Sequence, residues 1–173
     1  ALRTKFVLLA FNYPGLRLLL LRKTLPELRE NHLLPLLSQL NGIARYKREE
    51  RAFIFPNGSR IRLGDCDTES DIYQYQGQEY DWIFLEEATQ FTEDQFRTLG
   101  ACLRGATKIP RRMYLTCNPG GIGHLWVKRL FVDREYRDGE KAEDYTFIRA
   151  TVDDNPQLME ASPEYKLMLD LLP

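Results

Sequence analysis

Three short apolar runs, separated by segments long enough to hold helices, constrain the fold of this chain more than any other feature of its sequence. The runs are residues 16–21, 82–85 and 114–117. Their length, and the polar or turn residues that bound them, favour strands buried on both faces of a sheet over helices. Parallel neighbours need a crossover of roughly a dozen residues or more, which the intervening segments provide. The sequence therefore predicts an α/β fold in which these runs are parallel, adjacent strands of one mostly parallel sheet.

Helices are predicted on either side of these strands. Residues 2–12 are apolar at most positions and suit a largely buried helix. Thr24 can cap a helix that runs to about Leu40, and Thr92 can cap another that runs to about Arg104. These helices supply the crossovers that the parallel strands need.

A β-hairpin and one further strand complete the predicted elements. Residues 53–55 and 60–63 flank Pro56-Asn57-Gly58-Ser59, where Asn-Gly supplies the positive φ angles of a tight turn. Residues 64–79 are polar and acidic and are expected to form a loop. Residues 145–151 alternate in polarity, which predicts a strand.

Composition limits the classes of protein that fit. Of the 173 residues, 43% are apolar and 28% charged, which suits one globular domain and excludes a disordered tail or fibrous repeat. The net charge of −1 argues against a polybasic nucleic-acid binder, although a local basic face stays open. The apolar runs are too short to span a membrane. The cysteines, Cys66, Cys102 and Cys117, form no CxxC pair and indicate a reduced, cytoplasmic setting.

Both ends of the chain read as interrupted helices. No Met stands at position 1, and no capping residue precedes the helical pattern that begins there. Residues 162–173 also read as a helix that stops short. We expect residues 1–173 to be a single domain truncated at both ends, cut from a longer protein. A processed domain with frayed ends is the alternative.

The sharpest chemical signal is the sequence Tyr80-Asp-Trp-Ile-Phe-Leu-Glu-Glu87, a buried strand that ends in two adjacent carboxylates. Ligands of parallel sheets gather at the carboxyl ends of strands. There Glu86 can hold the water shell of Mg²⁺, and Glu87 can polarise a water for attack on a phosphate. This is the Walker B arrangement of phosphate-loop ATPases. A strand that turns polar where it meets solvent gives the same pattern.

The phosphate-binding loop that should accompany these acids, G-x-x-x-x-G-K-[ST], is absent from the 173 residues. Residues 100–107 have its glycine spacing, but Ala106 replaces the lysine. Residues 118–123 form a glycine-rich link between a strand and a helix, which can bind an anion or can simply be a tight connection. Asn118 is expected at the same sheet edge as Glu87, placed to sense a phosphate or orient a water.

Other candidate sites find little support. The acidic series Asp65, Asp67, Glu69 and Asp71 lacks the glycine and glutamate of a calcium loop and reads as a solvated loop. His32 and His124 have no histidine or cysteine at metal-ligand spacing, so each is expected to be a helix residue or a cap.

Taken in order and spacing, several motifs resemble the ATPase domain of the terminase large subunit of tailed bacteriophages across nearly the whole chain. No single motif is specific, but the combination is selective. The motifs are Arg22-Lys23-Thr24, Pro56-Asn57-Gly58-Ser59, Glu86-Glu87-Ala88-Thr89-Gln90, Leu103-Arg104, Asn118-Pro119-Gly120-Gly121 and Trp126-Val127-Lys128.

The resemblance implies a DNA-packaging motor that uses ATP and Mg²⁺. It assigns Glu86 to the metal, where an aspartate is usual, and Glu87 to catalysis. Asn118 falls in the nucleotide-sensing motif that couples hydrolysis to movement, and Arg104 is a candidate arginine for the γ-phosphate, from the same or a neighbouring subunit. Implied partners are double-stranded DNA, the portal protein, the small terminase subunit and further copies in a ring. The implied location is the cytoplasm of the infected bacterium.

The resemblance also implies a P-loop NTPase fold of the RecA-like type, a mostly parallel sheet flanked by helices. The phosphate-loop strand would lie upstream of Ala1, beside the strand at 114–117, so this chain would lack it, and a nuclease domain would lie beyond Pro173. Two alternatives stay open: a helicase-type or other DNA-translocating ATPase, and a non-catalytic remnant of such an enzyme.

Overall fold

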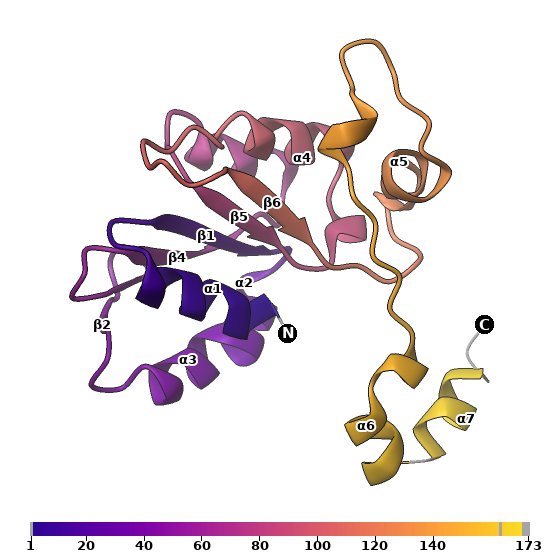
Figure 1. The fold of residues 1–173 in the computed structure, drawn as a ribbon, viewed down its shortest axis with the longest axis horizontal. Helices are drawn as coiled ribbons and strands as arrows, with labels where there is room; N and C mark the ends of the chain where they lie inside the picture. Colours follow the sequence, from indigo (N-terminus) through magenta and orange to yellow (C-terminus); the bar gives the residue numbers. More distant parts are fainter. Residues whose placement is uncertain (1, 163, 171–173) are drawn as a thin grey trace. The chain divides into compact units, whose positions relative to one another are not determined.

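The computed structural model describes residues 2–162 and 164–170 and divides the chain into two compact units, residues 1–128 and 129–173. The first unit is an α/β layer structure, with one sheet between two layers of helices (Figure 1). The second holds short helical segments. Whether residues 1–173 form a single truncated domain stays a prediction. Among the described residues, no helix is both long and apolar enough to cross a lipid bilayer.

The sheet of the first unit has six strands in the order β2-β3-β4-β1-β5-β6. The strands are β2 (Arg45–Lys47), β3 (Ala52–Ile54), β4 (Arg60–Asp65), β1 (Arg17–Arg22), β5 (Trp82–Leu85) and β6 (Arg112–Leu115). β1 pairs with β4 and β5 in parallel, and β5 pairs with β6 in parallel. The prediction that the three apolar runs form adjacent parallel strands is confirmed, and the sheet is mixed because β2 and β3 are antiparallel.

Side chains of β1 alternate between two buried faces. Leu18 and Leu20 join Phe6 of α1 (Leu2–Asn12) in one core, which the helices on that face cover. Leu19 and Leu21 are fully buried on the other face. In Figure 1 α4 (Glu93–Gly100) lies on the side of the sheet opposite α1, and the 3₁₀ helix η2 (Glu69–Tyr75) contacts α4. A strand buried on both faces cannot alternate in polarity, which is why β1 is a run of leucines between two arginines.

The predicted hairpin forms between β3 and β4, and its turn also completes α1. The Asn57 amide donates to the carbonyls of Ala10 (2.9 Å) and Phe11 (3.1 Å), two of the orphan acceptors at the end of that helix. The Ser59 hydroxyl donates to the Tyr13 carbonyl (2.6 Å) and accepts from the Leu16 amide (3.1 Å). The Pro-Asn-Gly-Ser sequence thus joins the hairpin, the helix and the start of β1.

The helix predicted from Thr24 to Leu40 forms, but it contains a π-helical turn. The segments are α2 (Leu25–Leu28), the π-turn η1 (Arg29–Leu33) and α3 (Leu34–Gln39). Pro35 explains the interruption, because it has no N–H to donate to the Asn31 carbonyl and its ring crowds that oxygen. Arg3 of α1 donates to this carbonyl instead, at 2.9 Å. The widened turn carries the buried His32.

Three predictions about the chain were wrong. Residues 64–79 are not all loop, because β4 extends to Asp65 and η2 follows, capped by Thr68. Residues 145–151 are not a strand: residues 145–150 have no regular structure, since no described strand lies beside them to take their backbone hydrogen bonds. The helix after Thr92 ends at Gly100 rather than Arg104. Beyond residue 128 the described elements are the turns η4 (Lys128–Asp133), η5 (Ala142–Asp144) and η6 (Val152–Asp154) and the helices α6 (Pro156–Ala161) and α7 (Glu164–Asp170).

Asn57→Ala should lower the free energy of unfolding by roughly 1–3 kcal/mol, because it leaves helix-end carbonyls of α1 without their donor. Asn41→Ala is the matched control, since Asn41 lies in an exposed turn. Urea unfolding of both variants measures the difference. Equal midpoints for the two variants would show that the hairpin does not stabilise α1.

Candidate active site

The two acids predicted from the sequence lie where the chain leaves β5. The Glu86 amide still bonds to the Leu21 carbonyl of β1 (3.0 Å), and the Ala88 amide reaches the Thr116 carbonyl just after β6 (2.8 Å). The carboxyl ends of β1, β5 and β6 are therefore tied together around the acids. This is the edge of a parallel sheet at which ligands bind.

The side chains of Arg22 and His32 both contact the carboxylate of Glu86. The pairing of Leu21 with Leu85 makes Arg22 and Glu86 the next neighbours, and the Arg22 guanidinium donates to Glu86 Oε2 at 2.6 Å. His32 Nε2 lies 2.6 Å from the same oxygen. Burial alone raises the pKa of Glu86, but the hydrogen bonds from His32 and Arg22 outweigh it and lower the pKa to about 2. Glu86 is therefore an anion at neutral pH.

This partnership was not predicted from the sequence. His32 was expected to be an ordinary helix residue; it is in a helix, but it is buried against Glu86. The available signal was Pro35, which predicts a disturbed turn where His32 lies. Arg22 could have been found from the pairing of the two strands. It directly follows Leu21 of β1, Glu86 directly follows Leu85 of β5, and Leu21 pairs with Leu85.

Glu87 differs from Glu86 in backbone and in surroundings. Its φ of 55° and ψ of 54° place it in the left-handed region, which is uncommon for a non-glycine residue and is often found at functional sites. Its carboxylate is half-buried and has no hydrogen bond or ion pair among the described residues. A free, partly shielded carboxylate at this edge is suited to polarise a water molecule.

The glycine-rich link after β6 packs against the segment that follows Glu87. Thr89 Oγ1 donates to the Asn118 carbonyl (3.0 Å), and the Gly123 amide donates to the Thr89 carbonyl (2.7 Å). A Cβ on Gly121, whose φ is +78°, would come within 2.5 Å of the Thr89 carbonyl oxygen. The glycines are thus needed for a tight connection, and Asn118 lies exposed at the same edge as Glu87, as expected.

Arg104 lies at the other end of β5. The neighbouring Gly105 amide bonds to the Tyr80 carbonyl at 3.0 Å, and the Arg104 side chain is exposed. The segment from Tyr80 to Glu87 contains β5, and at about 3.3 Å per extended residue it spans roughly 20 Å. The structure does not bring Arg104 together with the two acids of its own chain.

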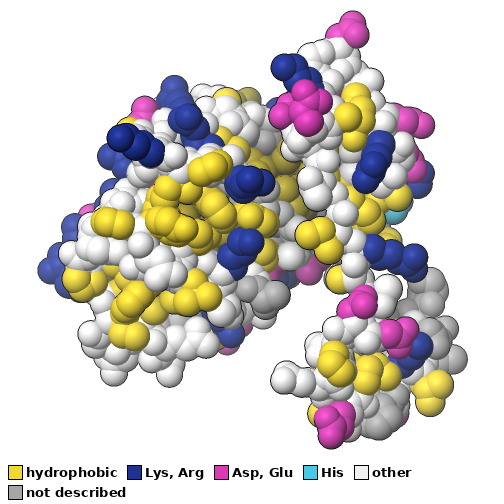
Figure 2. Space-filling model, in the orientation of Figure 1, with side chains coloured by type: hydrophobic (Ala, Val, Ile, Leu, Met, Phe, Trp, Pro, Cys, Tyr) yellow, Lys and Arg dark blue, Asp and Glu magenta, His cyan; other side chains and the backbone are white. Residues whose placement is uncertain are grey.

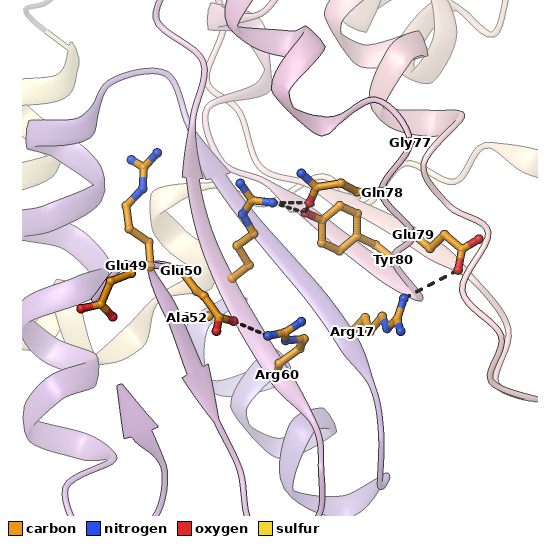
Figure 3. Close-up of a pocket in the computed structure, with 11 residues that line it drawn as sticks. Arg17, Glu49, Glu50, Ala52, Arg60, Gly77, Gln78, Glu79 and Tyr80 are labelled. Carbon is orange, nitrogen blue, oxygen red and sulfur yellow. Dashed lines mark hydrogen bonds and ion pairs between the residues drawn. The ribbon is translucent and has the colours of Figure 1, made fainter. Parts of the chain in front are cut away.

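A pocket of about 550 Å³ also opens at the amino-terminal end of the strands (Figure 3). Arginines and glutamates line it and neutralise one another: Arg17 lies 3.6 Å from Glu79, and Arg60 pairs with Glu50. Of the acidic series, Asp65 ends β4 and pairs with Arg51, and Asp71 caps η2. Among the described residues, no three His, Cys, Asp or Glu side chains converge as a metal cluster.

Comparison with known proteins identifies the family. The model of the phage terminase large subunit family matches residues 1–165. The chain belongs to this family. Among curated proteins, none matches the chain.

Solved terminase structures share the fold of this chain. The large terminase of a thermophilic bacteriophage is 21% identical, with a TM-score of 0.71 over 94% of this chain and 40% of that chain. The same enzyme has also been solved with ATP-γ-S. The large terminase ATPase domain of Thermus phage P74-26 is 16% identical, with a TM-score of 0.60 over 99% of this chain and 77% of that chain. The chain thus spans about two fifths of the first of these terminases and has the fold of a terminase ATPase domain, which is P-loop NTPase-like as predicted.

Acid should unfold this chain partly through Glu86. A carboxyl whose pKa is lowered on folding stabilises the fold above its unfolded pKa, here about 4.5, and loses that contribution as pH falls through the folded value of about 2. Between these values the wild-type protein should lose more stability than Glu86→Gln, measured as urea midpoints at stepped pH. Parallel pH curves for the two proteins would contradict the lowered pKa.

Proposed function

We propose that the protein carrying this chain hydrolyses ATP, with Mg²⁺, and uses the energy to drive double-stranded DNA into a viral procapsid. The observation that carries the proposal is the pair of acids at the end of β5, of which Glu86 is held and Glu87 is free. Family membership supports it, and favours a packaging motor over a helicase-type enzyme. The terminase of the thermophilic bacteriophage, which has the same fold, was solved with ATP-γ-S and with ADP.

The donor chemistry of the site suits Mg²⁺. Glu86 and Glu87 offer only oxygen atoms, which this ion prefers, and the ion usually keeps several waters and takes further oxygens from substrate phosphates. The lack of a three-residue metal cluster in the described part of the chain fits that mode of binding. The bound ion would neutralise charge on the phosphates. We assign Glu86 to its water shell and Glu87 to the attacking water.

Two further roles follow from position. Asn118, exposed beside the segment after Glu87, would contact the γ-phosphate side of the nucleotide and report hydrolysis to the rest of the chain. Arg104, at the far end of β5, would act only on the nucleotide of a neighbouring subunit in a ring. Its exposure supports that reading.

The phosphate-binding loop would come from residues upstream of Ala1. In the described sheet β6 has a neighbour on one side only, which leaves an edge for one more strand. Figure 2 shows apolar side chains gathered over β6 and alongside α1, and an apolar surface beside an unpaired strand is suited to be covered. A phosphate-loop strand that paired with β6 in parallel would have its carboxyl end beside Glu87 and Asn118.

The proposed partners are double-stranded DNA, the portal protein, the small terminase subunit and other copies in a ring, in the cytoplasm of the infected bacterium. For DNA, the chain offers a local basic face at the β2 edge. Arg45 and Arg48 are exposed and have no ion pair among the described residues, whereas the nearby basic residues Lys47, Arg51 and Arg60 pair with Glu50 or Asp65. Phosphate contacts of this kind need no sequence-specific geometry.

Glu87→Gln in the full-length protein should lower ATP turnover roughly 10²–10⁴-fold, because it removes the charge that polarises the attacking water. Affinity for ATP should be kept, since the phosphates are held elsewhere. Turnover with DNA and portal present, and binding of ATP-γ-S, measure the two effects.

Glu30→Gln is the control for this experiment, because Glu30 is an exposed carboxylate on η1 and pairs only with Arg29 among the described residues. Its turnover should match wild type. Normal turnover of Glu87→Gln would reject the catalytic role of Glu87 and with it the proposed reaction.

Residues 1–173 alone should not hydrolyse ATP, because they contain no G-x-x-x-x-G-K-[ST] sequence to hold the β- and γ-phosphates. Phosphate release from the purified fragment is the measurement. Turnover that Glu87→Gln abolishes would show that the fragment binds the phosphates by other means.

A further inference from the structure

We propose that Arg22 and His32 are positioning residues that fix one oxygen of Glu86 and thereby aim its other oxygen at the water shell of the Mg²⁺ ion. The inference rests on the proposed function, because it assigns Arg22 and His32 a task in the same reaction.

The geometry separates the two oxygens of Glu86. Arg22 and His32 both reach Oε2, each at 2.6 Å, so the two lone pairs of that atom are engaged. Oε1 has no hydrogen-bond partner among the described residues and is not buried away from solvent. One oxygen is thus held by the protein and the other faces outward.

The two donors come from different elements, which fixes Oε2 in two directions. Arg22 ends the central strand β1, and His32 sits on the π-turn that Pro35 produces. The side chains of Arg22 and His32 are 13% and 4% exposed, less than the 19% of Glu86. The donors to Oε2 therefore lie on the side of the carboxylate that is shielded from solvent.

Stability alone does not explain this cluster. Taking charged groups out of water costs free energy that their attraction often only offsets. The bonds to Glu86 also leave two polar atoms of the donors unsatisfied, because Arg22 Nε and His32 Nδ1 are buried without a partner among the described residues. A role in orienting a metal-facing carboxylate accounts for keeping these buried polar groups. Removing such partners typically weakens metal affinity or activity about 10–100-fold.

The test compares His32→Gln with His32→Asn in the full-length protein. Both replace the ring by an amide, but only the longer Gln places its N–H where Nε2 lies. We expect His32→Asn to raise the Mg²⁺ concentration that supports half-maximal ATP-γ-S binding, by about 10-fold or more, and to lower kcat with little change in KM for ATP. His32→Gln should restore both toward wild type. Arg22→Lys, which keeps the positive charge on a single donor nitrogen, should shift the Mg²⁺ dependence in the same direction by less.

Controls separate the possible failures. Glu30→Gln, on the same π-turn, should leave the Mg²⁺ dependence unchanged, and melting temperatures report any structural loss. If His32→Asn and Arg22→Lys melt earlier but keep wild-type Mg²⁺ dependence, the cluster is only structural and the inference is overturned. It is likewise overturned if His32→Asn does not fold and Arg22→Lys leaves that dependence unchanged. If Glu87→Gln keeps normal turnover, the proposed function fails instead, whatever the His32 variants do.

Discussion

The pairing of β1 with β5 is the constraint on which the rest of this chain depends. It joins two buried apolar strands in the centre of the sheet, and its register places Leu21 beside Leu85. A parallel pair brings both carboxyl ends to the same edge, so the polar residues that follow the apolar run of each strand meet there. Arg22 and Glu86 are those residues, and their opposite charges make the meeting favourable. The hydrophobic effect that buries the leucines thus also fixes the charge pair.

Much of this fold could be predicted from the sequence, because its strongest signals are local. The leucine run of β1 and the Asn57-Gly58 turn each carry their own physical reason, burial on two faces in one case and a positive φ in the other. β2 escaped prediction because three charged and aromatic residues at an edge show no usable periodicity. For residues 145–151 a periodicity was present but the predicted strand does not form. Alternating polarity is typical of a half-buried strand, but a strand also needs a partner for its backbone hydrogen bonds.

The site was predictable only in part, for a similar reason. That Glu86 and Glu87 differ follows from adjacency on a strand, since neighbouring side chains start on opposite faces. The left-handed backbone of Glu87 does not follow, because nothing local favours it in a glutamate. The His32 contact depends on where a helix packs after Pro35 disturbs it, which is a tertiary outcome. Arg104 was named from the resemblance and from no local pattern; it lies at the far end of β5 from the acids of its own chain, and a role toward a neighbouring subunit stays a prediction.

Two carboxylates, one at each end of the central strands, accept hydrogen bonds from the fold in different ways. At the amino end, Asp81 is almost fully buried and accepts from the Arg17 amide (2.9 Å) and from Thr107. Both of its oxygens are engaged by groups of the fold, so it can only hold strands in place. At the carboxyl end, Glu86 receives both of its donors on one oxygen. A carboxylate with one oxygen fixed and one free has a defined direction, and that asymmetry makes this edge of the sheet, and not the other, fit to meet a ligand.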